Sequence, residues 1–491
     1  MKKYDETSPE SIESYGKGMI GKTFREIFDA AKDDPDGFVA KDACADYLRK
    51  HAQKSRKGGV GNLVEECWFG YEANSDDRPD FPEAGVELKV TPYKQVRKTQ
   101  LNPEGFAAKE RLVLTMINYM EVVKEKDFAH SHLWEKAQLM LLVWYLHLQG
   151  RNDIDSTVDY VQLFTPPAED LEIIREDYEK ILTKIRDGRA HELSEGDTLY
   201  LGACTKAAKS TDRRQQPYSD ILAKPRAFSL KNKYMTYVLN HYIRPGRVTY
   251  EPAVRGKVSD FEAYIIETIG RHRGESMEEL RKRYGIETHP KNLGAMLAYR
   301  MLGIKGNHCA EFEKAGIAIK SIRIQENGCI KENMSFPPIS YQNLAKETWE
   351  DCTFGNYLRE TRFFFVVYRE DRAGALRLAG CCFWNVPVRD LEGDIRAVWQ
   401  ETHDIIADGR LVLDIDAKGN VTNNLPKKHG HPIAHVRPHG RNRADTAPLP
   451  EGTYLAVRGN TAAWLDDTAY TKQCFWLNND YIRHQLQLSG M

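Results

Sequence analysis

Five stretches of the chain carry hydrophobic residues at the spacing of a helix or a strand. Residues 8–31 open with Ser-Pro-Glu, a common helix start, and then place apolar residues at helical intervals. Residues 60–71 predict a second helix, and residues 219–243 end in a third. Residues 86–93 alternate as a strand does, and the apolar run 137–148 is typical of a central strand. This mixture predicts an α/β fold.

The pattern occurs twice along the chain. Five blocks of the first half recur in the second half in the same order, which indicates a tandem duplication. The matched blocks are 14–22 with 263–271, 61–70 with 294–303, 80–89 with 311–320, 202–209 with 434–441, and 224–235 with 471–482. The stretch 244–256 is rich in Pro and Gly and predicts a linker. We therefore expect two tandem domains, residues 1–246 and 257–491, each a short mixed sheet flanked by helices.

Length and composition narrow the class of protein. With 491 residues, of which 41% are hydrophobic and 29% charged, the chain is long enough for several domains and polar enough to be soluble. It has no apolar run near ~18 residues and no apolar signal segment after its first lysines, which predicts a cytoplasmic protein with no membrane span. Its nine cysteines form no Cys-x-x-Cys pair, so neither structural zinc nor a disulfide framework is expected.

Positive charge is concentrated in two stretches, although the whole chain has a formal net charge of −1. Residues 206–247 hold ten Lys and Arg against two acids, a local net charge of +8. Residues 427–443 hold five Lys and Arg, four His and no acid. A charge run is often only a solvated face, but basic runs at matching places of a duplication favour a nucleic-acid-binding surface in each half.

The stretch PDFPEAGVELKVTP, residues 79–92, holds the candidate chemistry. Side chains of a strand alternate between its faces, so Glu87 and Lys89 share one face while Leu88 points to the other. The simplest explanation is an amphipathic strand with a solvated Glu–Lys face. Asp80 adds a second acid nearby in the sequence. Two acids and a lysine around one strand also suit the cleavage of phosphodiester bonds.

Metal-assisted hydrolysis gives each of these groups a role. Mg²⁺ prefers oxygen ligands and is usually held by one or two carboxylates together with water and phosphate oxygens. Asp80 and Glu87 would supply the carboxylates, while Lys89 would orient the attacking water and add positive charge at the transition state. Glu65, on the preceding helix, would hold or shape a second metal position.

The duplication separates the two explanations. The corresponding positions are Glu311 for Asp80, Ala318 for Glu87, Lys320 for Lys89 and Ala298 for Glu65. The apolar frame survives in both halves, but two of the acids do not. We interpret this difference as one working metal site in the first half and one site in the second half that has lost its ligands.

The residues around this site resemble a known family. The block KGGVGNLVE, residues 57–65, followed by DFPEAGVELK, residues 80–89, is similar to the MutH-type endonucleases, a group of mismatch-repair nicking enzymes with restriction-enzyme relatives. CTKAAK and PRAFSLKNKY are similar to the DNA-contacting C-terminal region of that family. The resemblance covers the first half nearly end to end and, in degenerate form, the second. The tandem arrangement resembles the two-domain, GATC-cutting type IIE restriction endonucleases.

The resemblance implies a set of functional residues. It makes Asp80, Glu87 and Lys89 the catalytic set, with Glu65 as an additional acid. The implied DNA-contacting residues are Lys57, Lys206, Arg226, Lys231 and Lys233 in the first half, and Arg437, His439 and Arg441 in the second. At the positions matching Lys206, Arg226, Lys231 and Lys233, the second half has His439, Gln473, Asn478 and Asp480. The DNA surface of the second half therefore departs from the family pattern.

The implied activity is that of a Mg²⁺-dependent type II restriction endonuclease. It would hydrolyse double-stranded DNA at GATC, and a second recognition site bound to the C-terminal domain would stimulate cutting by the first. One active site per chain favours the pairing of two chains on DNA. A DNA methyltransferase of the same specificity is the expected partner in the cell.

Three alternatives stay open at this point. The first is a repair-type enzyme that only nicks, although nicking relatives need just one domain. The second is a DNA-binding module without catalysis, which would not retain every acid of the first half. The third is a metal site formed by the histidines of HGHPIAHVRPH, residues 429–439, which are better explained as DNA-facing loop residues.

Overall fold

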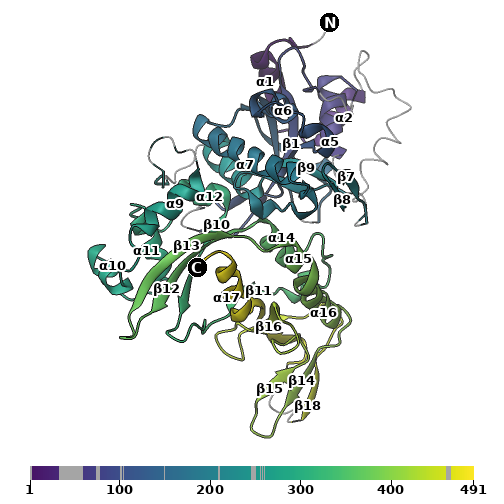
Figure 1. Ribbon diagram of the computed structural model, residues 1–491. Helices are drawn as coiled ribbons and strands as arrows, with labels where there is room; N and C mark the ends of the chain where they lie inside the picture. The colour runs from purple at the N-terminus through teal and green to yellow at the C-terminus, as the bar shows by residue number, and fades with distance from the viewer. Residues whose placement is uncertain are drawn as a thin grey trace. The chain divides into compact units, whose positions relative to one another are not determined.

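Two compact units divide the chain in a computed structural model (Figure 1). The N-terminal unit comprises Met1–Leu193, Asp197–Tyr250 and Ala310–Gly316, and the C-terminal unit comprises Ser194–Gly196, Glu251–Cys309 and Ile317–Met491. The structure describes residues 3–32, 59–72, 78–99, 102, 104–148, 150–207, 209, 211–244, 250–254, 256, 258, 260–459 and 466–491. The division after Tyr250 falls within the linker stretch 244–256, but a short later segment also belongs to the N-terminal unit.

A four-stranded mixed sheet forms the first layer of the N-terminal unit, in the order β2-β1-β4-β5. Its strands are β1 (Glu87–Gln95), β2 (Phe106–Ala108), β4 (Met140–Leu146) and β5 (Val158–Phe164). β1 and β4 run parallel, and the other pairs are antiparallel. β4 is the apolar run predicted as a central strand, and its residues are almost completely buried. Each of its large apolar side chains contributes about 1.5–3 kcal/mol of burial free energy.

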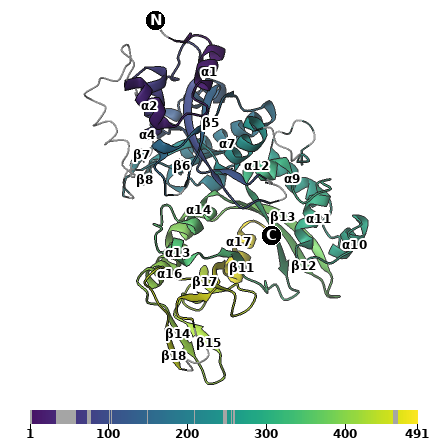
Figure 2. The same cartoon turned by 180° about the vertical axis from the view of Figure 1, so that it is seen from behind.

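Helices cover this sheet and join it to a second one. The unit's helices are α1 (Pro9–Lys17), α2 (Phe24–Lys32), α4 (Gly59–Leu63) with its π-helical continuation Val64–Phe69, α5 (Tyr119–Val122), α6 (His132–Ala137), α7 (Ala168–Arg186), α8 (Asn232–Tyr237) with its continuation Val238–Ile243, and α12 (Ala310–Ala315). α1 begins as predicted, because the Ser8 side chain accepts a hydrogen bond from the Ser11 N–H, and it packs beside β5 (Figure 2).

The second sheet of the N-terminal unit has the order β3-β9-β6. Its strands are β3 (Leu112–Met116), β6 (Leu201–Thr205) and β9 (Arg226–Leu230). The buried carboxylate of Asp177 on α7 accepts the backbone N–H groups of Leu199, Tyr200 and Leu201, which fixes the start of β6. A separate two-stranded ribbon consists of β7 (Arg214–Gln216) and β8 (Ser219–Ala223).

The C-terminal unit repeats both sheets. Its first sheet has the order β10-β12-β13 and its second the order β11-β20-β16. The strands are β10 (Ile317–Ile324), β12 (Arg362–Glu370), β13 (Leu376–Trp384), β11 (Met334–Pro338), β16 (Ala434–Pro438) and β20 (Gln473–Leu477). β10 and β12 are parallel, as are β1 and β4. β12 and β13 are antiparallel, as are β4 and β5. The predicted duplication of a mixed sheet is therefore confirmed.

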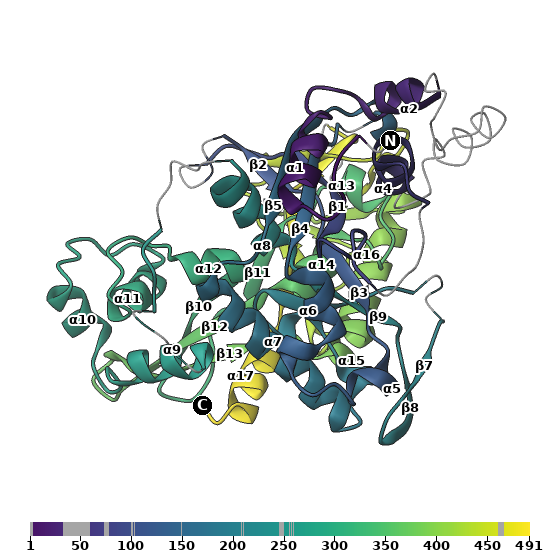
Figure 3. The ribbon, with the colours of Figure 1, turned by 90° about the horizontal axis from the view of Figure 1, so that it is seen from above.

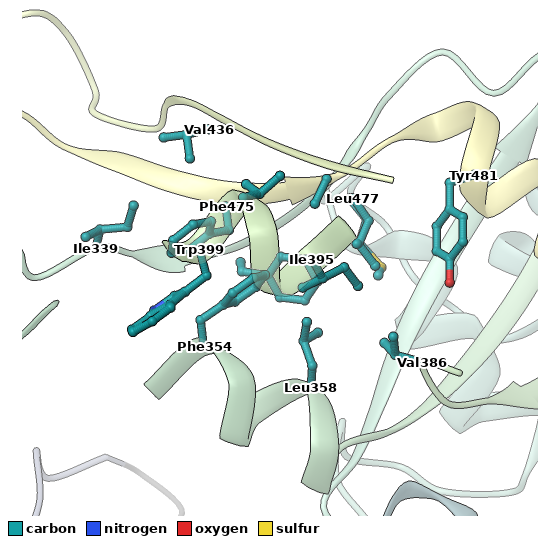
Figure 4. Packing of buried hydrophobic residues seen from close by; sticks show 14 of the residues in the cluster. Ile339, Phe354, Leu358, Val386, Ile395, Trp399, Val436, Phe475, Leu477 and Tyr481 are labelled. Carbon is teal, nitrogen blue, oxygen red and sulfur yellow. The ribbon is translucent and has the colours of Figure 1, made fainter. Parts of the chain in front are cut away.

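Further elements complete this unit. Its helices are α9 (Phe261–Gly270), α10 (Met277–Arg283), α11 (Leu293–Met301), α13 (Tyr341–Leu344), α14 (Thr353–Glu360), α15 (Val388–Asp390), the π-helical Leu391–Ile395, α16 (Arg396–Ala407) and α17 (Asn479–Leu488). Its remaining strands are β14 (Val412–Ile415), β15 (Val421–Asn423), β17 (Thr446–Pro448), β18 (Ala456–Gly459) and β19 (Ala469–Thr471). In the core, the rings of Phe354 and Phe475 stack at 4.2 Å near Trp399 (Figure 4).

Matching backbone bonds show the duplication at atomic detail. The Lys206 N–H donates to the Pro225 carbonyl at 2.9 Å, and the His439 N–H donates to the Lys472 carbonyl at 2.9 Å. Matched side chains also agree, because the Tyr234 hydroxyl donates to Asp170 in one unit and the Tyr481 hydroxyl donates to Asp390 in the other. The two units thus share a scaffold down to single hydrogen bonds. Within the described part of the chain, no helix has the length and apolar character needed to cross a membrane.

Candidate active site

Strand β1 places Glu87 and Lys89 on one face of the N-terminal sheet. β1 lies between β2 and β4 in the sheet, and Glu87 at its start is only 3% exposed. The Lys89 ammonium lies 2.7 Å from Glu87 Oε1 and also donates to the Leu114 carbonyl at 3.4 Å. The explanation by a solvated Glu–Lys face is therefore wrong, because the Glu87 side chain is buried. Burying a charged pair is costly, which favours a functional reason for its position.

Asp80 reaches the same place through a tight return of the chain. Phe81 and Val86 pair as a short antiparallel bridge, and Gly85 between them adopts a left-handed φ of 65°, which a side chain would strain. This return lets Asp80 Oδ2 accept the Leu88 N–H at 2.8 Å. The two acids and the lysine predicted from the sequence are thus brought together at the start of β1.

A second lysine joins the cluster and was not predicted from the sequence. Lys136, on the last turn of α6, places its ammonium 3.7 Å from Glu87 Oε1. The cause is the parallel pairing of β1 and β4, in which Glu87 lies opposite Met140. α6 leads directly into β4, so its last turn ends beside the start of β1. The sequence alone does not give the register of β1 against β4, and without that register Lys136 could not be identified as a member of the cluster.

Burial and mutual repulsion raise the pKa values of the acids. Burial, followed by the nearby Glu87, raises the pKa of Asp80 to about 6. Burial, followed by the nearby Asp80, raises the pKa of Glu65 to about 7. Glu65 belongs to the π-helical turn that follows α4, and its charge interacts with those of Asp80, Lys89 and Glu87, so this acid lies beside the cluster. A cation among the carboxylates would remove the repulsion and favour their charged forms.

The donor set fits a hard divalent cation. Glu87 Oε2 is buried and has no hydrogen-bond partner among the described residues, so one carboxylate oxygen remains available. Over those same residues, no three His, Cys, Asp or Glu side chains already surround one point as ligands. Two protein carboxylates completed by water and phosphate oxygens are nevertheless the usual way in which proteins hold Mg²⁺.

The predicted DNA-contacting residues of the first half divide by exposure. Lys206 and Lys233 are exposed, as a phosphate contact requires. Arg226 is buried and donates to the Ala203 carbonyl at 2.5 Å, and the buried Lys231 ammonium donates to the Thr198 carbonyl. Both buried side chains brace the second sheet, and their contact with DNA stays a prediction. Lys57 lies outside the described residues.

The matching site of the C-terminal unit is built differently. Lys320 occupies the place of Lys89 on β10, but within the described chain no acid forms an ion pair with it, and burial lowers its pKa. Glu311, the match of Asp80, lies on α12, which belongs to the N-terminal unit. The same strand position therefore carries a lysine beside acids in the N-terminal unit and, as far as the described residues show, a lysine without an acid partner in the C-terminal unit.

The basic surface of the C-terminal unit centres on one aromatic ring. The Arg437 guanidinium lies 4.9 Å from the centre of the Trp476 ring. The His439 and Trp476 rings meet edge to face, with their centres 5.6 Å apart. Arg437, His439 and Arg441 are all exposed. His435, by contrast, is buried in β16 and bonds Asn478, so its interpretation as a DNA-facing loop residue is wrong. The histidines do not gather as metal ligands within the described residues.

Comparison with known proteins gives consistent results. The sequence model described as DNA mismatch repair enzyme MutH matches residues 69–177. The chain is 35% identical to the type II restriction enzyme Sau3AI of Staphylococcus aureus over 465 residues, which cover 88% of this chain and 93% of that protein. It is 29% identical to the DNA mismatch repair protein MutH of Serratia proteamaculans over 37% of this chain and 76% of that protein. The MutH of Shewanella amazonensis is 28% identical over 38% and 80%.

Proposed function

Because the chain belongs to the MutH-like type II restriction endonucleases, which are site-specific deoxyribonucleases, we propose that its N-terminal unit cuts double-stranded DNA at GATC with Mg²⁺. The observation that carries this proposal is the cluster of Asp80, Glu87 and Lys89 at the start of β1. A buried carboxylate oxygen without a partner lies in the same cluster. GATC is the site expected from the family resemblance.

The acids of the cluster would hold the metal ion. Asp80 and Glu87 would be its ligands. The carboxylate of Glu65 is close enough to interact with both of them and would help to hold or orient the metal ion. When bound, Mg²⁺ polarises the scissile phosphate and lowers the pKa of water beside it. The Leu88 N–H holds one oxygen of Asp80 in place, so that carboxylate is positioned before any ligand arrives.

The two lysines would supply positive charge around the phosphate. The Lys89 ammonium donates to two acceptors, Glu87 Oε1 and the Leu114 carbonyl, so it is oriented in advance. It would position the attacking water and stabilise negative charge that develops on the phosphate oxygens. Lys136 approaches the same carboxylate from α6 and would add charge without direct contact to the water.

The C-terminal unit would bind a second copy of the site. Support comes from its exposed Arg437, His439 and Arg441, of which the first two contact Trp476, and from Ala318 in the place of Glu87. Such a unit keeps a surface for phosphates but has lost the ligand for chemistry. Occupancy there would favour cutting by the N-terminal unit, which couples two sites in one chain.

Cutting both strands requires two N-terminal units or two successive nicks. One active cluster per chain favours the pairing of two chains on DNA. A methyltransferase of the same specificity would protect the DNA of the cell that makes the enzyme.

Plasmids that differ only in the number of GATC sites test the proposal. With Mg²⁺, we expect fast double-strand cutting of a plasmid with several sites and slow cutting of a plasmid with one site. A short GATC duplex added in trans should accelerate the slow reaction, and Arg437→Ala combined with Arg441→Ala should abolish that acceleration. Nicked circles as the final product would instead indicate a repair-type enzyme, and cutting without regard to GATC would refute the specificity.

A further inference from the structure

The β7–β8 ribbon leaves its apolar side chains in solvent. Tyr218 at its turn is 76% exposed, and Ile221 and Leu222 on β8 are 56% and 50% exposed. Adjacent residues of a strand point to opposite faces, so Ile221 and Leu222 place an exposed apolar side chain on each face of the ribbon. Figure 3 shows β7 and β8 projecting as a hairpin from the body of the N-terminal unit. An exposed apolar ribbon of this kind marks an interaction surface.

The ribbon is nevertheless firmly anchored. The buried side chain of Gln216 accepts the Ala190 N–H at 2.6 Å and donates to the Ile221 carbonyl, which ties both strands to the body. The turn packs against Gly188, where an added Cβ would lie 2.6 Å from the Tyr218 carbonyl oxygen. Tyr218 is the single non-glycine residue with positive φ in the described chain, at 62°. A strained backbone that is held in this way indicates a functional position.

Continuous bonds connect the ribbon to the active cluster. Lys89 donates to the Leu114 carbonyl on β3, and β3 ends two residues later at Met116. The next N–H, from Ile117, donates to the Arg226 carbonyl at 2.9 Å, and the Tyr119 hydroxyl donates to the Lys224 carbonyl at 2.6 Å. β8 ends directly before Lys224. By strand spacings, the path from Leu114 to Lys224 is about 20 Å long, or some six base pairs of DNA. The base of the ribbon lies no further than this from the β3 residue that Lys89 contacts.

We propose that the β7–β8 ribbon enters the major groove of DNA beside the cleaved bond and places Tyr218, Ile221 and Leu222 against thymine methyl groups. The inference rests on the proposed function, because it extends the DNA surface of the same active unit. Arg213 and Arg214 at the start of the ribbon are exposed and supply the charge that complements phosphates. A two-stranded ribbon fits the major groove, about 12 Å wide, and not the minor groove, about 6 Å wide.

Duplex binding by the full chain tests this proposal. The parent is Glu87→Gln, so that the DNA stays intact, and the probe is a labelled duplex with a central GATC followed by fluorescence anisotropy. Tyr218→Asn removes the ring and keeps the turn, since Asn tolerates positive φ. We expect it, and Ile221→Ser combined with Leu222→Ser, to weaken binding about tenfold each. Leu148→Ser is the matched control, because Leu148 is exposed and follows the end of β4 remote from Glu87.

A thymine-to-uracil scan of the same duplex identifies the contact. Removal of one methyl group should weaken binding by the parent about fourfold at a contacted position. The same substitution should have no effect on the ribbon variants, since the partner is already gone. Variants that bind as tightly as the parent, with an unchanged scan, would overturn the proposal. A parent that binds GATC and scrambled duplexes equally would refute the site specificity, while the comparison of parent with variants would still decide the role of the ribbon.

Discussion

Strands β1 and β10 occupy the same place in two copies of one fold and differ in chemistry. Glu87 lies opposite Met140 on the parallel neighbour of β1, and Ala318 lies opposite Phe363 on the parallel neighbour of β10. Two residues further along, each strand carries a lysine. In the first unit that lysine pairs with an acid at 2.7 Å. In the second it is half-buried, and no acid among the described residues forms an ion pair with it. The scaffold therefore persists when the ligands are lost.

The helix before each central strand shows the same divergence. Lys136 on α6 precedes Met140 by four residues, and Arg359 on α14 precedes Phe363 by four. Lys136 faces Glu87, whereas Arg359 stacks on Trp349 at 4.8 Å and bonds its carbonyl at 3.0 Å. The fold thus places a cation here in both units, beside Glu87 in one and against Trp349 and Glu392 in the other. Fold position alone therefore does not assign a function.

The largest expected effect is on Asp80, at whose matching position in the repeat Glu311 lies on α12. Asp80→Asn keeps the size of the side chain and removes its charge. We expect single-turnover cleavage to fall on the order of 10³-fold, because the metal contributes several kcal/mol to the transition state. Equilibrium binding of the GATC duplex should stay within about threefold of the unchanged chain. A variant that still cuts at a comparable rate would remove Asp80 from the metal site.

The lysines should show a graded loss. Lys89→Met is expected to reduce single-turnover cleavage about 10²–10³-fold, since it removes an oriented positive charge beside the phosphate. Lys136→Met should reduce it about tenfold, because its ammonium lies further from Glu87, at 3.7 Å. Equal losses for the two lysines would contradict their different roles. The rate at saturating Mg²⁺ is the quantity to compare.

The raised pKa values of the acids predict a pH-dependent metal requirement. Protons compete with Mg²⁺ for Asp80 and Glu65, whose pKa values are raised to about 6 and about 7. The Mg²⁺ concentration for half-maximal cleavage should therefore rise as the pH is lowered from about 8 to about 6. A requirement that is constant across this range would show that these acids do not bind the ion.

The same acids set the direction of a stability effect. The pKa of Glu65 is raised from 4.5 to about 7 in the folded protein, so the folded state binds its proton more tightly than the unfolded state. The free energy of unfolding at this site is therefore highest below pH 4.5 and decreases as the pH rises to about 7. Glu65→Gln should be more stable than the unchanged chain at pH 8 without metal, and equal to it at pH 4. Urea unfolding at the two pH values measures this difference.

The smallest expected effect compares the tyrosines that both units share. Tyr481 donates to Asp390 at 2.8 Å, and Tyr234 donates to Asp170 at 3.0 Å. Asp170 also pairs with the buried Lys314 at 2.5 Å and so keeps a strong partner when Tyr234 is changed. The other partner of Asp390, Arg389 at 3.1 Å, is 91% exposed and therefore weaker. We expect Tyr481→Phe to cost about 2 kcal/mol and Tyr234→Phe about 1 kcal/mol of unfolding free energy. The reverse order in urea unfolding would contradict this account.

Much of the fold and the first acids could be predicted from the sequence. Helical spacing and the Ser8 cap located α1, and the apolar run before residue 148 located β4. The repeat predicted two sheets with one intact cluster. Lys136 could not be predicted, because its place depends on the register of β1 against β4. The burial of Arg226 and Lys231 could not be predicted either, because both lie in a basic stretch of the kind that is usually exposed. Arg226 begins β9, and Lys231 follows the end of that strand.

One measurement tests the central claim, that a single cluster in each chain cuts DNA. Glu87→Gln and Lys320→Met should be compared in single-turnover cleavage of a plasmid with several GATC sites. We expect Glu87→Gln to lose cutting of both strands on the order of 10³-fold and Lys320→Met to cut within about twofold of the unchanged chain. If Glu87→Gln still nicks the plasmid, and this nicking disappears when Lys320→Met is added to the same chain, a second active site exists and the account is contradicted.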